Sequence, residues 1–315
     1  MNLGGARWLS GVRPQRAVRL HPRRARQPLD PASSKMGWPF LWPADEPWPV
    51  CRQRNPEMVP IFEAAIERAE LKGIDSNRDG LGLPTPRGIE TGLLERYRSG
   101  HNAAYLPVLQ LSRSEFHELP FPGDSDLVQL LWCPMVHFEG GGGYLIFWRR
   151  AEAVTSLRVE PPPPAVDGYW IAPSAFDPER IDDYPNRFEV TPLPIASLDS
   201  ETDWWQTMED SGPAPGTKLF GFPKWVQSPD YPRCGRCGIQ MALLVTISST
   251  EFGHGDPDDI RWIPNEDREV LGNAPFALRE EYELPHNWMI GDGGEAYLFY
   301  CRNCRGEFDS RVQCS

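Results

Sequence analysis

The sequence predicts an α+β fold made mostly of antiparallel β-sheet, with few helices and a four-cysteine zinc site in its C-terminal half. Three observations favour this class. The 315 residues include 34 prolines and 12 tryptophans, a composition typical of short strands and irregular connections. Short apolar or aromatic runs bounded by glycine recur along the chain, whereas only two stretches have helical spacing. With 40% hydrophobic residues, the chain is long enough to bury a sizeable core.

The first 35 residues differ in charge from the rest of the chain. They carry seven Arg and one Lys against a single acid, Asp30, although the whole chain has a net charge of −12. We expect so basic a segment, poor in apolar residues, to be a disordered extension with almost no packed contacts. Met36, followed by Gly-Trp-Pro-Phe, looks like a natural start for a folded body over residues 36–315. A mitochondrial transit peptide within Arg7–Arg26 is the alternative.

Charge and hydropathy also limit the expected partners and compartment. No stretch of about 20 apolar residues is present to span a bilayer, and the N-terminus lacks the apolar core of a secretory signal. We therefore expect a cytoplasmic protein without a membrane partner. Beyond residue 35 the acidic residues clearly outnumber the basic ones, which is a poor match for a phosphate backbone. Nucleic acid is not an expected partner.

Two segments are predicted to be helical. Pro56 and Glu57 lead into an apolar stripe at helical spacing, and Gly73 stands where a C-terminal cap belongs. The stripe consists of Phe62, Ala65, Ile66 and Ala69. Its regular spacing is that of a helix face packed on the core. A second, shorter helix is predicted over residues 89–98.

The chain has two halves with a similar order of elements. Each half offers an apolar strand, a connection, a glycine turn and an aromatic strand. The strands and turns are residues 127–132, 140–143 and 144–148 in the first half, and 241–247, 291–294 and 297–300 in the second. The polyproline run Pro161–Pro164 is the predicted boundary. A duplicated β-rich unit, with halves of about 36–160 and 165–315, accounts for this pattern.

Four cysteines form the strongest chemical signal. Cys234 and Cys237 make one CxxC pair, and Cys301 and Cys304 make a second. A tight turn in each pair brings both sulfurs to one side, so two pairs together can chelate a tetrahedral zinc ion. Disulfides or a thioredoxin-like redox motif are the alternatives, but a reducing compartment and the absence of a βαβ context disfavour them. The long insertion over residues 238–300 must leave the site and return to it.

A second group of residues offers an alternative chemistry. Cys133 and His137 are four residues apart, in Trp-Cys-Pro-Met-Val-His, and can form a nucleophile and its base or two metal ligands. A hydrolytic enzyme that uses both in a cleft between the halves is therefore the alternative function. A buried structural cysteine beside a surface histidine is the commoner arrangement.

Several short blocks around the zinc ligands resemble a known family. They are Lys218–Gln227, Pro232, the two CxxC pairs, Met241–Ile247, Gly291–Gly294 and Tyr297–Cys301. These blocks resemble the YwqG-like family of bacterial proteins, and their order is similar to that in the eukaryotic programmed cell death protein 2 relatives. The resemblance covers about residues 105–305, although relatives often have two adjacent glycines where this chain has Phe220 and Gly221. It supplies no catalytic residue.

The resemblance implies a module that binds another protein. Some YwqG-like proteins are suspected immunity proteins beside polymorphic toxins, and the eukaryotic relatives are dedicated chaperones for a ribosomal protein. The acidic body suits a basic protein partner, because it steers the encounter electrostatically. We therefore expect a non-enzymatic, zinc-stabilised protein-binding module. Trp225 and Gln227 are the predicted partner-binding residues, with packing of Trp225 against the core as the alternative.

Overall fold

The structure is a computed structural model of the chain. It describes residues 12–51, 103–133, 143–162, 170–186, 212–252, 276–291 and 293–314, with single residues or pairs between 59 and 98 and between 189 and 271. The chain divides into two compact units. Unit 1 consists of Met1–Arg23, Phe176–Pro285 and Met289–Ser315, and unit 2 of Arg24–Ala175 and His286–Trp288.

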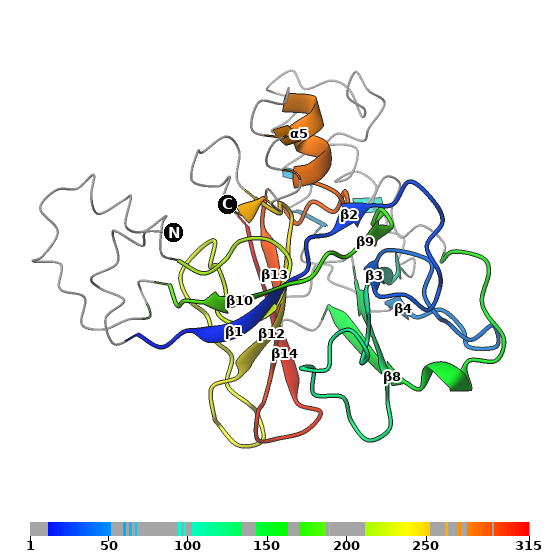
Figure 1. The fold of residues 1–315 in the computed structure, drawn as a ribbon, viewed down its shortest axis with the longest axis horizontal. Coiled ribbons are helices and arrows are strands. Elements are labelled where there is room, and N and C mark those ends of the chain that lie inside the picture. The colour runs from blue at the N-terminus through cyan, green and yellow to red at the C-terminus, as the bar shows by residue number, and fades with distance from the viewer. Residues whose placement is uncertain are drawn as a thin grey trace, which may run out of the picture. The chain divides into compact units, whose positions relative to one another are not determined.

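Unit 1 is built on a six-stranded antiparallel sheet. Its strands are β1 (Gln15–Arg19), β10 (Glu179–Asp183), β11 (Lys218–Phe220), β12 (Ala242–Ser248), β13 (Glu295–Tyr300) and β14 (Phe308–Gln313). Their order in the sheet is β10-β1-β11-β12-β13-β14, and every neighbouring pair runs antiparallel (Figure 1). Nearly every residue of β12 and β13 is buried, so both faces of the sheet are covered there.

The prediction that residues 1–35 are a disordered extension is wrong for residues 12–35. β1 pairs with β10 on one side and with β11 on the other. Farther along, β3 (Lys35–Met36) pairs with two strands of the sheet in unit 2. The prediction assumed that so many cations must stay in water. The structure instead buries Arg19 and Lys35 against carbonyl oxygens and partly buries Arg23 against carboxylates, which offsets the cost of removing the charge from solvent.

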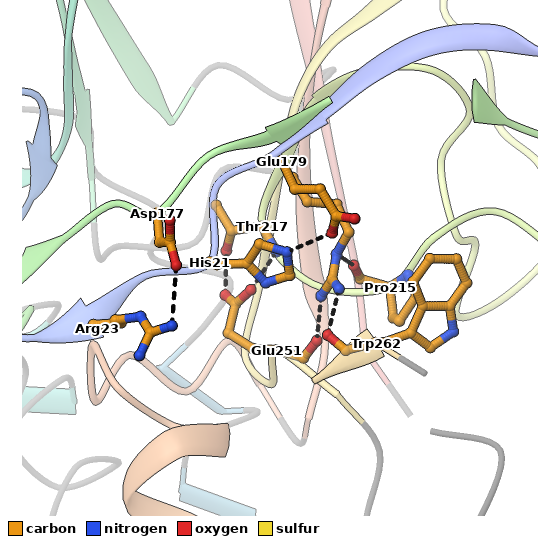
Figure 2. A network of polar contacts seen from close by, with 9 residues as sticks. His21, Arg23, Asp177, Glu179, Pro215, Thr217, Glu251 and Trp262 are labelled. Carbon is orange, nitrogen blue, oxygen red and sulfur yellow. Dashed lines mark hydrogen bonds and ion pairs between the residues drawn. The ribbon is translucent and has the colours of Figure 1, made fainter. Parts of the chain in front are cut away.

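Arg19 shows how such a cation is accommodated. Its side chain is 0% exposed, and the guanidinium donates hydrogen bonds to the backbone carbonyls of Pro215 (3.0 Å), Trp262 (2.6 Å) and Glu251 (2.9 Å). The Glu251 carboxylate accepts from the backbone N–H (2.9 Å) and the hydroxyl (2.6 Å) of Thr217 (Figure 2). Burial lowers the pKa of Arg19 to about 10, although Glu251 acts to raise it. The guanidinium therefore remains charged at neutral pH and holds three loops of unit 1 together.

The residues that follow β1 extend this network with further polar contacts. His21 lies beside Glu179, with Nε2 3.0 Å from Oε2, and Arg23 contacts Asp177 at 3.0 Å (Figure 2). Arg23 also pairs with Asp267 at 2.9 Å. Burial lowers the pKa of His21, with the positive charge of Arg19 acting in the same direction.

Unit 2 contains a second six-stranded sheet. Its strands are β2 (Arg23–Arg24), β3, β6 (Leu106–Ser112), β7 (Leu127–Trp132), β8 (Tyr144–Arg149) and β9 (Ser174–Ala175), in the order β2-β9-β3-β6-β7-β8. The short strands β4 (Val50–Cys51) and β5 (Ala103–Ala104) form a separate pair. The core cluster of this unit includes Phe40, Trp42, Trp48, Tyr105 and Leu131. The strands predicted over 127–132 and 144–148 are thus confirmed.

The two sheets share a series of five strands. The series β9-β3-β6-β7-β8 in unit 2 corresponds in sheet order to β10-β1-β11-β12-β13 in unit 1. The last four strands of each series also follow one another in the same chain order, but β9 comes after β8 in the chain, whereas β10 comes before β11. Lys35 of β3 is buried like Arg19 of β1, and its Nζ also donates to three carbonyls, those of Asp30 (2.7 Å), Pro31 (3.0 Å) and Ser33 (2.8 Å). Burial lowers the pKa of Lys35 to about 8. A common origin of the units stays a prediction, but the predicted boundary at Pro161–Pro164 precedes the observed one at Ala175.

Helices are few in the described parts of the chain. The structure gives α5 (Phe276–Glu283) and a 3₁₀ turn, η2 (Ala151–Ala153). The described residues within the two predicted helices, which include Val59, Glu63 and Leu94, are helical, and the remaining positions of those helices lie outside the description. Within the same parts of the chain, no helix combines the length and apolar character needed to cross a bilayer.

The first residue of β13 makes the stability of unit 1 depend on pH. The side chain of Glu295 is buried at the end of the sheet, where Ser248 donates a hydrogen bond to Oε1 (3.2 Å). Among the described residues, Oε2 has no hydrogen-bond partner. Burial raises the pKa of this carboxyl from 4.5 to about 7, although Lys224 acts to lower it. The folded state therefore holds the proton more tightly than the unfolded state does.

We expect Glu295→Gln to stabilise the protein at high pH and not at low pH. The wild-type carboxyl contributes most favourably below pH 4.5, and this contribution is lost as the pH rises toward 7, where a buried charge must be carried. The variant carries no such charge. Urea unfolding should give the variant an advantage on the order of 2 kcal/mol at pH 8 that shrinks toward pH 5. An advantage independent of pH would contradict this explanation.

Candidate metal centre

Four cysteine sulfurs converge at one end of unit 1. The Sγ atoms of Cys234, Cys237, Cys301 and Cys304 all lie within 4.8 Å of one another. The Sγ atoms of Cys237 and Cys301 are 3.5 Å apart, far longer than the roughly 2.05 Å of a disulfide. Four sulfurs bound at about 2.3 Å to a tetrahedral ion stand about 3.8 Å apart, so these positions fit a metal. The cysteines are thus positioned to bind a metal ion, as their spacing predicted.

The first pair is held by a tight turn. The N–H of Gly238 donates to the carbonyl of Cys234 (2.8 Å), and the N–H of Cys234 donates to the carbonyl of Ile239 (2.9 Å). Arg233 and Gln240 form an antiparallel bridge just outside this turn. Gly238 has φ +73°, a left-handed conformation that L side chains adopt at a cost. The turn leads directly into β12.

The second pair is the connection of a β-hairpin. β13 ends at Tyr300, and β14 begins at Phe308, so Cys301 and Cys304 lie in the loop between them. The N–H of Cys301 donates to the carbonyl of Glu307 (3.0 Å), which continues the ladder by one step into the loop. The N–H of Cys304 points to Sγ of Cys301 at 3.3 Å.

The long insertion between the two pairs is accounted for by strand pairing. β12 and β13 are neighbours, with Ala242 opposite Tyr300 at the metal end and Ser248 opposite Glu295 at the other. Residues 249–294 therefore leave and re-enter the sheet at the end remote from the cysteines. The β12–β13 ladder closes this loop in the absence of a metal, so the ion adds a clamp across an already paired end.

The environment of Cys301 favours its thiolate. Burial by itself raises the pKa of this thiol, but N–H groups of Cys304 and Asn303 and the thiols of Cys237 and Cys234 outweigh that effect and lower the pKa to about 7. A metal-binding cysteine must lose its proton, so a backbone that already stabilises sulfur charge assists binding.

Trp225 packs against the cysteines of the metal centre and is not exposed to solvent. It is buried in a cluster with Cys234, Cys301 and several aromatic side chains. Its ring lies 4.8 Å from that of Tyr297 and stacks on Phe299 at 5.9 Å. Trp225 thus packs against the core, as the alternative interpretation of the sequence expected, and its role in partner binding stays a prediction. Burying a large apolar side chain against the cysteines stabilises the fold more than leaving it at the edge of a binding surface would.

Gln227 has an exposed side chain, but it also ties two segments together. Its backbone N–H donates to Oε1 of Gln313 (2.9 Å), and its Nε2 donates to the carbonyl of Cys314 (2.7 Å). These bonds fasten the loop after Trp225 to the end of β14. A partner that recruits Gln227 would have to share or displace them.

Of the predicted pair of Cys133 and His137, the structure describes only Cys133. Cys133 is 1% exposed and belongs to the aromatic core cluster of unit 2, next to Tyr105. A thiol buried in this way is out of reach of a substrate, so Cys133 does not suit a nucleophile. His137 lies outside the described residues.

The glycine of the first metal-binding turn provides a local test. We expect Gly238→Ala to lower the stability of the metal-bound protein by about 1 kcal/mol, because alanine is strained at φ +73°. No atom lies within 4 Å of the added methyl, so the backbone angle alone should act. Gly235→Ala is the matched control, since that site is equally open and has no positive φ. Equal melting temperatures for the two variants would contradict the role of the turn.

Comparisons with known proteins assign no family. No protein-family model matches the chain. No curated protein matches it either. The four sulfurs and their surroundings are therefore the features from which a function is inferred.

Proposed function

We propose that this chain is a protein-binding module whose C-terminal half is stabilised by zinc, and that it performs no chemistry of its own. The observation that carries the proposal is the ligand set. All four ligands are cysteine sulfurs, and a tetrahedral ion bound by four of them has no open position for water or substrate. Such an ion stabilises the fold and does not activate a nucleophile.

Zinc is the proposed metal on chemical grounds. Four thiolates in a tetrahedral arrangement suit zinc or an iron–sulfur centre. The two are distinguished by colour, because an iron centre absorbs visible light and zinc does not. We place the protein in the cytoplasm, where the glutathione pool keeps thiols reduced and available to a metal.

The nature of the partner is supported by charge and by the resemblance of the sequence blocks. A chain of net charge −12 attracts a basic protein and steers its approach. The similarity to YwqG-like proteins and to programmed cell death protein 2 relatives points in the same direction, since a suspected immunity protein and a chaperone both act by binding a protein. A basic protein of the same cell is therefore the proposed partner.

Affinity capture followed by reconstitution tests this proposal. The tagged, metal-loaded chain should enrich a basic protein from cells in which it is native, and the purified pair should form a complex of defined stoichiometry by native mass spectrometry. Salt should weaken the complex, since the encounter is electrostatic. Failure of every captured protein to bind in purified form would contradict the proposal, as would a turnover that survives removal of the metal.

A further inference from the structure

The sheet of unit 1 contains a slot where one strand stops early. β11 pairs with β1 as far as Ala17 opposite Phe220, and with β12 as far as Leu219 opposite Val245. Phe220 has φ +60°, and Gly221 has φ +72°, so the chain turns out of the sheet after three residues of β11. The strands on either side continue. Among the described residues, Gln15 and Arg16 of β1, and residues 242–244 of β12, have no ladder partner on the β11 side.

A pocket of about 650 Å³ lies along this interruption. Its walls come from β1, from the turn after β11, from β12 and from both metal-binding loops. The lining includes Val12, Gln15, Phe222, Ile239, Ala242 and Arg302. Ile239 is one of the exposed large apolar side chains, which gives the slot an apolar wall at its metal end. The volume falls within the roughly 300–1,000 Å³ of sites that take small ligands or short peptides.

The slot also contains a carboxylate, Glu189, that forms no ion pair with any Lys or Arg in the described part of the chain, although the charge of Lys218 acts on it from a distance. Glu189 lines the pocket, and its oxygens accept hydrogen bonds from the hydroxyl of Tyr231 and from the N–H of Asn186 (2.8 Å). Burial raises the pKa of Glu189 despite these hydrogen bonds. A cationic group in the slot would reverse that cost, because an opposite charge favours the ionised form.

We propose that this slot binds an extended segment of the protein partner, with its backbone in the place of the missing half of β11 and a Lys or Arg side chain against Glu189. The inference rests on the proposed function and specifies where and how that function acts. Only an extended backbone can satisfy two open strand edges at once, and such β-augmentation is a common mode of peptide recognition. The charge of Glu189 matches the basic partner expected for an acidic chain.

The metal-binding loops would then form one end of the binding site. Ile239 precedes β12, and Arg302 reaches from the second loop toward β1, where its Nη2 donates to Oε1 of Gln15 (3.2 Å). That bond lies on the exposed surface, so a bound segment can replace it at little cost. The ion would thereby hold the slot in shape without touching the partner.

A peptide of defined chemistry tests the proposal. The probe is a fluorescein-labelled pentapeptide of alternating valine and lysine, blocked at both ends, titrated into the metal-loaded chain. We expect saturable binding with a Kd below about 1 mM, and slowed amide exchange at Arg16 and Leu243. A peptide with glutamate in place of lysine should bind at least about tenfold more weakly, and so should one with N-methylated backbone amides.

Two variants place the binding in the slot. Glu189→Gln removes the charge and should weaken the lysine peptide at least about tenfold, while Ala242→Trp should fill the slot and abolish binding. Glu160→Gln, an exposed acid in unit 2, is the matched control and should leave the affinity unchanged. An unchanged metal content and melting temperature identify variants that remain folded. Absence of peptide binding, or equal affinity for the wild type and Ala242→Trp, would overturn the proposal.

The captured partner separates failure of this proposal from failure of the proposed function. If a purified partner binds Ala242→Trp as tightly as the wild type, the chain is a protein-binding module but the slot is not its site. If the chain forms a dimer that Ala242→Trp abolishes and that the peptide cannot displace, the occupant is a second copy and the proposal is wrong. If neither a partner nor the peptide binds, both the proposed function and the proposed binding site are contradicted.

Discussion

Replacing Cys301 by Ser is expected to release the metal and to lower the free energy of unfolding by about 3–5 kcal/mol, as loss of a structural metal or cross-link does. A hydroxyl does not ionise at neutral pH and is a poor ligand for a soft site, so three sulfurs would remain around the ion. The clamp across the loop between β13 and β14 would be lost together with the first metal-binding turn. Lowering the pH should act in the same direction, because the thiolates must be protonated for the ion to leave.

Elemental mass spectrometry of protein purified without added metal, paired with denaturant unfolding, measures this effect. The wild type should carry about one zinc per chain, and a chelator should lower its stability to that of Cys301→Ser. Cys314→Ser is the matched control, because Cys314 is partly buried but lies outside the sulfur cluster. Metal-free wild-type protein with an unchanged transition in chelator would contradict the assignment of the site.

Replacing Lys218 by Met is expected to cost about 3–5 kcal/mol, because it breaks a buried ion pair from one side. Nζ of Lys218 lies 2.8 Å from the Asp183 carboxylate, and the two side chains are 0% and 1% exposed. Asp183 also accepts from the N–H groups of Ala214 (2.7 Å) and Phe222 (2.8 Å). The carboxylate would remain buried with its cation removed. A methionine fills the space without replacing the charge.

The neighbouring pair in the same sheet is the control for this effect. Arg16 and Asp182 lie 3.3 Å apart on β1 and β10, but their side chains are 81% and 51% exposed. Arg16→Met should therefore cost no more than about 1 kcal/mol, as exposed pairs generally do. Urea unfolding of both variants at neutral pH compares them. Equal losses would show that burial does not determine the worth of these pairs.

The four cysteines of the metal centre were predictable from sequence because a CxxC pair depends only on a local turn. Two residues between the cysteines are enough for a tight turn to place both sulfurs on one side, and this holds in any fold that permits the turn. Strands over residues 127–132 and 144–148 were predictable for a similar reason, since their apolar and aromatic runs exclude other structures. Phe220-Gly221 carried a local signal as well, and the paired positive φ angles there end β11.

The slot beside β11 was not predictable, because it is defined by what is missing from a sheet. Its walls come from residues as distant as Val12 and Arg302, and no local pattern in the chain relates them. Glu189 gave no sign of its role for the same reason. Its burial depends on Tyr231 and on the turn after β11, which only the folded sheet brings to it.

The N-terminal segment shows most clearly what the sequence determined and what the tertiary structure decided. The sequence by itself determined that residues 12–35 are basic and poor in apolar side chains, and by composition alone such a segment remains in water. Tertiary structure decided otherwise, because pairing of β1 between β10 and β11 brings Arg19 to three carbonyls contributed by distant loops. The cost of burying a charge depends on its neighbours. Those neighbours exist only once the sheet has formed, so local sequence decides the turn at each cysteine pair and the assembled sheet decides where a cation can be buried.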